Sequence, residues 1–190
     1  MSTKYQVADI LLFEPEKRNI LQSIQQHTDA SKSVHVEMIY DALSGGNDVI
    51  TLGSALDGLN YRERTIGAKH KVLRIADVCP LSIDQRQWAI ENYFNTKEST
   101  HGRAYPIINT IISGINRALE HETLGHWRRI DFGFYSGSSD CSATVAELIY
   151  IIWQGVLIHR ATNPNLIPFK LVTPGDIESA SGMDIIKEWG

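Results

Sequence analysis

One of the two cysteines of this 190-residue chain, Cys141, stands where a polar segment gives way to an apolar helical pattern. Residues 137–140 are small and polar, and residues 142–155 are rich in Val, Leu and Ile. A thiol at a helix N-terminus ionises more readily, because the macrodipole and the unpaired backbone N–H groups favour the thiolate. The position therefore suits a nucleophile, although a small buried residue that begins a helix would show the same pattern.

A cysteine nucleophile needs a base that takes its proton and later returns it to the leaving group. Imidazole suits this task because its pKa lies near neutrality. Of the seven histidines, only His35 lies in a strongly strand-like apolar segment, residues 33–40, and a strand holds a base more rigidly than a loop does. Alternation along this segment puts His35 and Glu37 on one face. We therefore take His35 as the candidate base, with a structural strand histidine as the alternative.

Other motifs in the chain fail to support a different chemistry. His121 and His126 are five residues apart, whereas the zinc-protease helix motif needs histidines four apart on one helical face. The run GFYSG, residues 133–137, puts its serine one position away from that of the serine-hydrolase elbow. Neither glycine-rich nucleotide-binding motif occurs. The net charge of −4 argues against a general nucleic-acid binder, which usually carries a basic face.

The strands and helices that the sequence indicates around these residues predict an α+β fold, in a single domain over residues 1–190. We expect strands at 7–13, 33–40, 48–52 and 71–78, and a last strand with a turn at 173–175 within 169–177. Helices are expected at 16–29, from a capping box at Ser82 to about residue 94, at 105–119 and after Cys141. The basic residues between 62 and 74 are interpreted as a solvated loop and strand edge, with an anionic-substrate patch as the alternative: Arg62, Arg64, Lys69, Lys71 and Arg74.

The bulk properties are those of an ordinary globular protein, with 43% hydrophobic residues. Two cysteines do not make a disulfide framework, and Cys79 is interpreted as a packed small hydrophobic residue. The N-terminus lacks a signal-peptide layout, and no apolar run is long enough to span a membrane. We expect a cytoplasmic protein or one secreted by a route that needs no signal peptide; a chain that has lost its leader would look the same.

The run Asp140-Cys141-Ser142 before an apolar helix resembles the active-site motif of the NlpC-type cell-wall cysteine peptidases, which are papain-like. In the usual members a Pro-Gly-Asp turn and a histidine strand follow the cysteine. Here the turn is present, but the histidine strand lies near the N-terminus, which is the order of the circularly permuted, YiiX-like branch. The matching segments are ADILLF at 8–13, HVEMIYD at 35–41, VLR at 72–74, GRAY at 102–105 and PGD at 174–176.

The resemblance implies a papain-like α+β fold with a small antiparallel sheet packed against helices and a nucleophile at a helix N-terminus. It implies a cysteine amidase or peptidase that acts through a thioester acyl-enzyme without cofactor or metal. His35 would deprotonate Cys141, whose backbone N–H would help to hold the oxyanion. The substrate most directly implied is a peptidoglycan stem peptide. A bacterial effector, with a secretion-system or immunity partner, would reconcile that substrate with the missing leader.

Several alternatives stay open at this point. The same machinery could deamidate a protein glutamine, or hydrolyse or transfer the acyl group of a lipid ester. The third catalytic residue usually lies on the strand after the histidine, where this chain has Thr51. Glu37, on the face of His35, and Asp48, near the hairpin end, are the other candidates. The missing carboxylate at the usual position also leaves a non-catalytic, papain-like binding module as a hypothesis.

Overall fold

The computed structural model describes residues 4–15, 31–43, 46–55, 58–97, 141–156 and 172–190, together with residues 115, 116, 119, 123 and 169. The helix predicted at 16–29 and most of the one predicted at 105–119 lie outside these residues. The motifs at 102–105 and 133–140 also lie outside them, as does the motif at 121–126 apart from residue 123.

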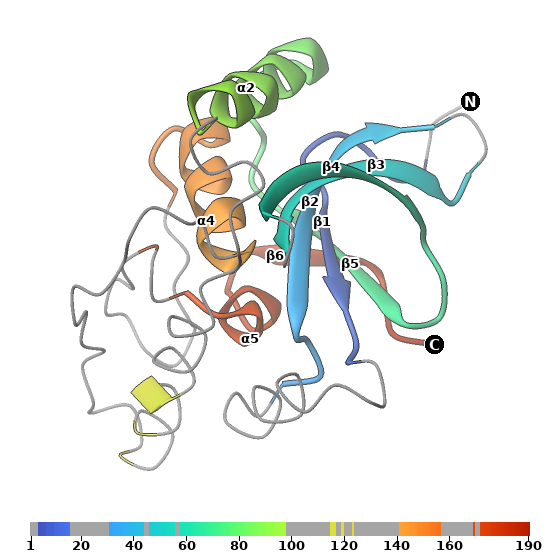
Figure 1. Cartoon of the computed structure of the whole chain (residues 1–190), viewed down its shortest axis with the longest axis vertical. Coiled ribbons are helices and arrows are strands. Elements are labelled where there is room, and N and C mark those ends of the chain that lie inside the picture. The colour runs from blue at the N-terminus through green and yellow to red at the C-terminus, as the bar shows by residue number, and fades with distance from the viewer. Residues whose placement is uncertain are drawn as a thin grey trace.

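A six-stranded antiparallel sheet forms the centre of the described structure (Figure 1). Its strands are β1 (Ile10–Phe13), β2 (His35–Ala42), β3 (Asp48–Ala55), β4 (Gly58–Thr65), β5 (His70–Ile75) and β6 (Met183–Lys187), in the order β4-β3-β2-β1-β5-β6. The predicted hairpin is confirmed, because β2 and β3 pair antiparallel with Met38 opposite Leu52. The α+β class predicted from the pattern is confirmed as well.

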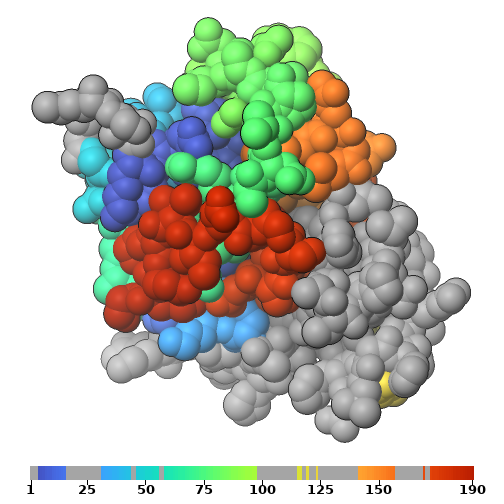
Figure 2. Space-filling model, turned by 180° about the vertical axis from the view of Figure 1, so that it is seen from behind, coloured from blue at the N-terminus to red at the C-terminus, as the bar shows by residue number. Residues whose placement is uncertain are grey.

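Two strands differ from the prediction. β4 was not predicted, because its second half, RERT, is charged and polar throughout, as an exposed edge strand can be. The turn expected at 173–175 is the start of the short helix α5 (Pro174–Glu178), and residues 170 and 171 of the strand expected before it lie outside the described residues. Thr173 caps this helix in a capping box with Asp176, and a proline at its start suits the first helical turn. The last strand is β6, which pairs with β5 and lies on the surface of the molecule (Figure 2).

Two longer helices match the prediction. The helix α2 (Ile83–Thr96) begins with the capping box of Ser82 and Gln85. The helix α4 (Cys141–Ile152) packs against β2 and β3 through the predicted apolar stripe: Val145, Leu148, Ile149 and Ile152. Gly155 follows the helix with a φ of +109°, a left-handed conformation that glycine adopts readily. Its N–H donates to Tyr150 O at 2.8 Å. Within the described ranges, none of the helices combines the length and the apolarity needed to cross a bilayer.

The sheet separates two buried apolar clusters. Ile10, Val36 and Met38 belong to the cluster that contains the buried side of α4. The alternate residues Leu11 and Ile39 belong to the second cluster, on the opposite face. Because side chains alternate along β2, Glu37 and His35 share the face of Ile39. The sheet thus buries Glu37, a charged residue, on the face away from the apolar stripe of α4.

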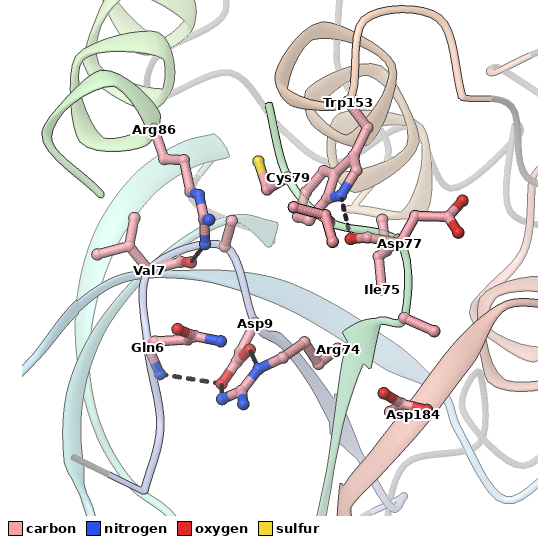
Figure 3. Close-up of a pocket in the computed structure, with 13 residues that line it drawn as sticks. Gln6, Val7, Asp9, Arg74, Ile75, Asp77, Cys79, Arg86, Trp153 and Asp184 are labelled. Atoms are coloured by element: carbon pink, nitrogen blue, oxygen red, sulfur yellow. Dashed lines mark hydrogen bonds and ion pairs between the residues drawn. The ribbon is translucent and has the colours of Figure 1, made fainter. Parts of the chain in front are cut away.

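A buried ion pair joins the segment before β1 to β5 (Figure 3). The side chain of Asp9 is 1% exposed, and Arg74 donates to both carboxylate oxygens at 2.7 Å. Burial raises the pKa of Asp9 above its usual range, in spite of the hydrogen bonds and charge of Arg74. A cavity of about 200 Å³ beside this pair extends to Cys79 and Trp153, beyond the C-terminal end of α4. Cys79 packs against the core there, as predicted.

We expect Arg74→Met to lower the free energy of unfolding by about 3 kcal/mol near neutral pH, because it leaves the buried Asp9 carboxylate without its counter-charge. The folded state already binds a proton on Asp9 more tightly than the unfolded chain does, and losing Arg74 strengthens this binding. The loss of folding stability is therefore complete above the pKa that Asp9 has in the folded variant, and it shrinks as the pH falls through that pKa. Urea denaturation at neutral and acidic pH measures both values. Equal losses at the two pH values would contradict the charge explanation.

Candidate active site

Cys141 is the first residue of α4. Its side chain is completely buried, and its Sγ lies 3.7 Å from Ser142 Oγ. The backbone N–H groups of the first helical turn have no partners within the helix itself. A thiolate and a developing oxyanion are the charges that such a helix end stabilises.

His35 is the first residue of β2, and its side chain is 19% exposed. Its Nε2 lies 2.9 Å from Glu37 Oε1. The imidazole also interacts with the side chain of Cys141 through a hydrogen bond and through charge. The ring packs against Phe13, with the centroids 5.2 Å apart. The structure thus brings the predicted base between the predicted nucleophile and a carboxylate.

Glu37 is completely buried and is held by three side chains. His35 contacts Oε1 at 2.9 Å, and Thr51 donates to Oε2 at 2.6 Å. Arg64 donates to both oxygens, from Nε to Oε2 at 2.9 Å and from Nη2 to Oε1 at 2.6 Å. The carboxylate therefore has a fixed orientation, with one oxygen directed at the imidazole.

The three candidates for the third catalytic residue lie in different places. Glu37 contacts His35 directly, at i+2 on the same strand. Thr51, at the position usual for the third residue, donates to Glu37 and so acts on the imidazole through the carboxylate. Asp48 binds the hydroxyl of Thr65 at 2.6 Å, in an exposed position at the start of β3.

Sequence reasoning missed the role of Arg64. Arg64 does lie on an edge strand, as predicted, but the interpretation as solvated residues is wrong for Arg64 and Arg74, which bind the buried carboxylates Glu37 and Asp9. Lys71 is also largely buried, and lies 3.4 Å from Glu188 and 3.7 Å from Glu178. The charge alternation of residues 62–64 was the available signal, because it places Arg62 and Arg64 on one face of a strand.

The charges of the site reinforce one another. Burial alone would lower the pKa of His35, but the negative charge of Cys141 and hydrogen bonds to Cys141 and Glu37 raise it to about 10. Burial alone would raise the pKa of Glu37, but hydrogen bonds and positive charges from His35 and Arg64 hold it well below its usual range. His35 therefore stays protonated and Glu37 ionised through neutral pH. A cysteine beside a protonated imidazole and an ionised carboxylate is an arrangement that can carry out nucleophilic attack followed by proton donation.

Neither the protein-family models nor the curated proteins contain a match to this chain. Among solved structures, the crystal structure of the metalloprotein YiiX from Escherichia coli O157:H7 (DUF1105) matches with a TM-score of 0.58. The match covers 98% of this chain and 99% of that chain, at 16% sequence identity. The chain therefore has the YiiX-like fold, which confirms the predicted resemblance to the permuted branch at the level of the fold.

YiiX is described as a metalloprotein, so we tested whether the residues of this chain could hold a metal ion. In the described part of the chain, no three His, Cys, Asp or Glu side chains are grouped as metal ligands. Both oxygens of Glu37 are occupied by Arg64, and the Nη1 of Arg62 lies 4.0 Å from Oε1. Two guanidinium groups next to the carboxylate disfavour a cation. These residues do not fit a metal site.

Gly53 provides the room for Glu37. A Cβ built at Gly53 would clash with Cγ of Glu37 and would lie 3.1 Å from its Cβ and Cδ. We expect Gly53→Ala to displace the carboxylate from His35 and to lower the alkylation rate of Cys141 at neutral pH by about tenfold. Overpacking of this kind also costs about 1–3 kcal/mol of folding stability.

Gly67→Ala is the matched control, because a Cβ there meets only His70 Nδ1, at 3.9 Å. Alkylation kinetics and thermal unfolding of both variants check the prediction. Unchanged Cys141 reactivity in a folded Gly53→Ala variant would show that the position of Glu37 does not matter for the thiol.

Proposed function

We propose that this chain is a cysteine hydrolase of amide or ester bonds, with Cys141 as nucleophile, His35 as acid–base residue and Glu37 as the carboxylate that orients His35. The observation that carries the proposal is the bridging position of His35, which hydrogen-bonds both Cys141 and a buried carboxylate. A buried thiol that only fills space has no need of this arrangement. Linked ionisable groups with strongly shifted pKa values are typical of catalytic sites.

The charges of the site support a direct mechanism. The Cys141 thiolate attacks the carbonyl carbon of the substrate, and the carbonyl oxygen becomes an oxyanion that the N–H groups at the start of α4 can bind. His35 then donates its proton to the leaving amine or alcohol, and a thioester remains on Cys141. Neutral His35 takes a proton from water, the resulting hydroxide attacks the thioester, and the thiolate leaves. The carboxylic acid product departs, and the resting imidazolium is restored.

Glu37 has two tasks in this mechanism. It accepts the Nε2 proton of the imidazolium, which fixes the orientation of the ring. Its negative charge also stabilises the imidazolium of the resting state, which a threonine in direct contact could not do. Thr51 keeps the second carboxylate oxygen in place. This division of tasks favours a catalytic site over a papain-like scaffold kept only for binding.

The substrate class proposed first is the amide bond of a peptidoglycan stem peptide. It rests on the YiiX-like fold and on the cysteine and histidine motifs in permuted order. Deamidation of a protein glutamine and hydrolysis or transfer of a lipid acyl group use the same steps, and they are the next substrates to assay. Delivery as an effector, with a secretion-system or immunity partner, stays a prediction.

The first test is alkylation of Cys141 by iodoacetamide as a function of pH, with the label located by mass spectrometry. In the wild type we expect alkylation to persist at about pH 6, where an ordinary thiol with a pKa of about 8.5 is almost fully protonated. His35→Ala removes the imidazolium, so its alkylation should require alkaline pH. Cys79 is the internal control. A Cys141 that reacts as an ordinary thiol in both proteins, or that cannot be alkylated at all, would falsify the catalytic assignment.

A second test ranks Glu37 against Thr51. Glu37→Gln removes the charge that raises the pKa of His35, so the midpoint of the acidic limb of the alkylation profile should move up by at least about one pH unit. Thr51→Val removes one hydrogen bond to a carboxylate that keeps its other partners, and should move the midpoint by less than half as much. The reverse order of effects would assign the role of third residue to Thr51.

A further inference from the structure

Arg64 reaches the candidate site from the edge strand β4, two strands away from Glu37. Its guanidinium binds the carboxylate in a fork, with N–O distances of 2.9 and 2.6 Å. Bidentate pairs of this type fix the plane of the carboxylate as well as its charge. Arg64 also lies over the ring of Phe13, with Cζ 5.2 Å from the centroid, and this ring packs against His35. Arg64 therefore contacts both the carboxylate and the aromatic neighbour of the base.

The charges around Glu37 explain why a second cation is needed. Glu37 on β2 is a buried negative charge, and in the proposed mechanism the attacking form of Cys141 on α4 adds a second one, whereas His35 supplies one positive charge between them. Burial lowers the pKa of His70 on β5, so this residue adds little positive charge at neutral pH. Among the residues that the structure describes, the other cations beside the carboxylate are Arg62 and Arg64 on β4, with N–O distances to Glu37 Oε1 of 4.0 and 2.6 Å. A buried carboxylate without its counter-charge becomes protonated.

We infer that Arg64 is a positioning residue, the counter-charge that keeps Glu37 ionised and directed at His35 while Cys141 carries a negative charge. Through Glu37 it extends the reactivity of Cys141 toward acidic pH. This inference rests on the proposed function of the three residues and deepens it. Arg64 does not contact the thiol or the substrate in this role, so its effect must pass through the carboxylate.

Arg62 is a matched control on the same face of the same strand. Its Nη1 lies 4.0 Å from Glu37 Oε1, but its donors serve backbone carbonyls instead. Nη1 donates to Gly53 O at 2.6 Å and to Asn60 O at 3.2 Å, and Nη2 donates to Gly58 O at 3.2 Å. Arg62 thus carries the same charge close to the site, but at 4.0 Å from the carboxylate and without the fork that Arg64 makes. Replacing it tests whether any nearby cation is sufficient.

The experiment measures the pH profile of Cys141 alkylation in the full chain for five variants: Arg64→Met, Arg64→Lys, Arg62→Met, Glu37→Gln and the double variant Glu37→Gln/Arg64→Met. In Arg64→Met the midpoint of the acidic limb should rise by at least about one pH unit, and the rate above that midpoint should return to the wild-type value. Arg64→Lys keeps the charge without the fork, and should recover part of this shift. Arg62→Met should move the midpoint by less than half as much as Arg64→Met.

The double variant separates the electrostatic role from a structural one. If Arg64 acts through Glu37, its removal should shift the midpoint by less than half as much in the Glu37→Gln background as in the wild type. An equal shift in both backgrounds would overturn the inference, as would a wild-type profile for Arg64→Met. Thermal unfolding reports whether each variant folds. If Arg64→Met does not fold, the pH profile of Arg64→Lys tests the inference in its place. An ordinary thiol profile for wild-type Cys141, indifferent to His35, would instead count against the proposed function itself.

Discussion

The described structure depends on one feature that is energetically unfavourable by itself, the buried carboxylate of Glu37. Moving such a group out of water costs several kcal/mol unless charges and hydrogen bonds replace the solvent. Three consecutive strands supply these replacements: His35 on β2, Thr51 on β3 and Arg64 on β4. The same face must also leave space for the side chain, and Gly53 on β3 provides it. The register of β2, β3 and β4 is therefore a condition for the charge state of Glu37.

The carboxylate in turn links the sheet to the helix. Glu37 and the negative charge of Cys141 both act on His35, and together they raise its pKa to about 10 despite its burial. When Cys141 carries its charge, His35 balances one of the two anions and Arg64 balances the other, so neither anion is left unpaired inside the protein. The packing of α4 on β2 and β3 through its apolar stripe holds the two ends of this chain of charges at a fixed distance.

The parts of this arrangement that follow from local periodicity could be predicted from the sequence. Alternation along β2 placed His35 and Glu37 on one face, and the change of pattern at Cys141 placed the thiol at a helix start. The partner of Glu37 could not be predicted in this way, because it depends on pairing between β3 and β4. β4 carries charged residues that resemble a solvated edge, and only the register shows that Arg64 points at a buried carboxylate. The choice between Glu37 and Thr51 likewise required side-chain positions, because both residues belong to the same hydrogen-bonded cluster.

The position of the carboxylate on the histidine's own strand has a consequence for the design of the site. A third residue on the next strand reaches the imidazole across the sheet, so its contact depends on strand register. An i+2 carboxylate reaches it along β2, because the strand period of two places both side chains on one face. The neighbouring position is then free for Thr51, which donates to the carboxylate instead of accepting from the imidazole. Such a site gains a closely coupled base but needs an added cation to keep the carboxylate charged, and Arg64 is placed to be that cation.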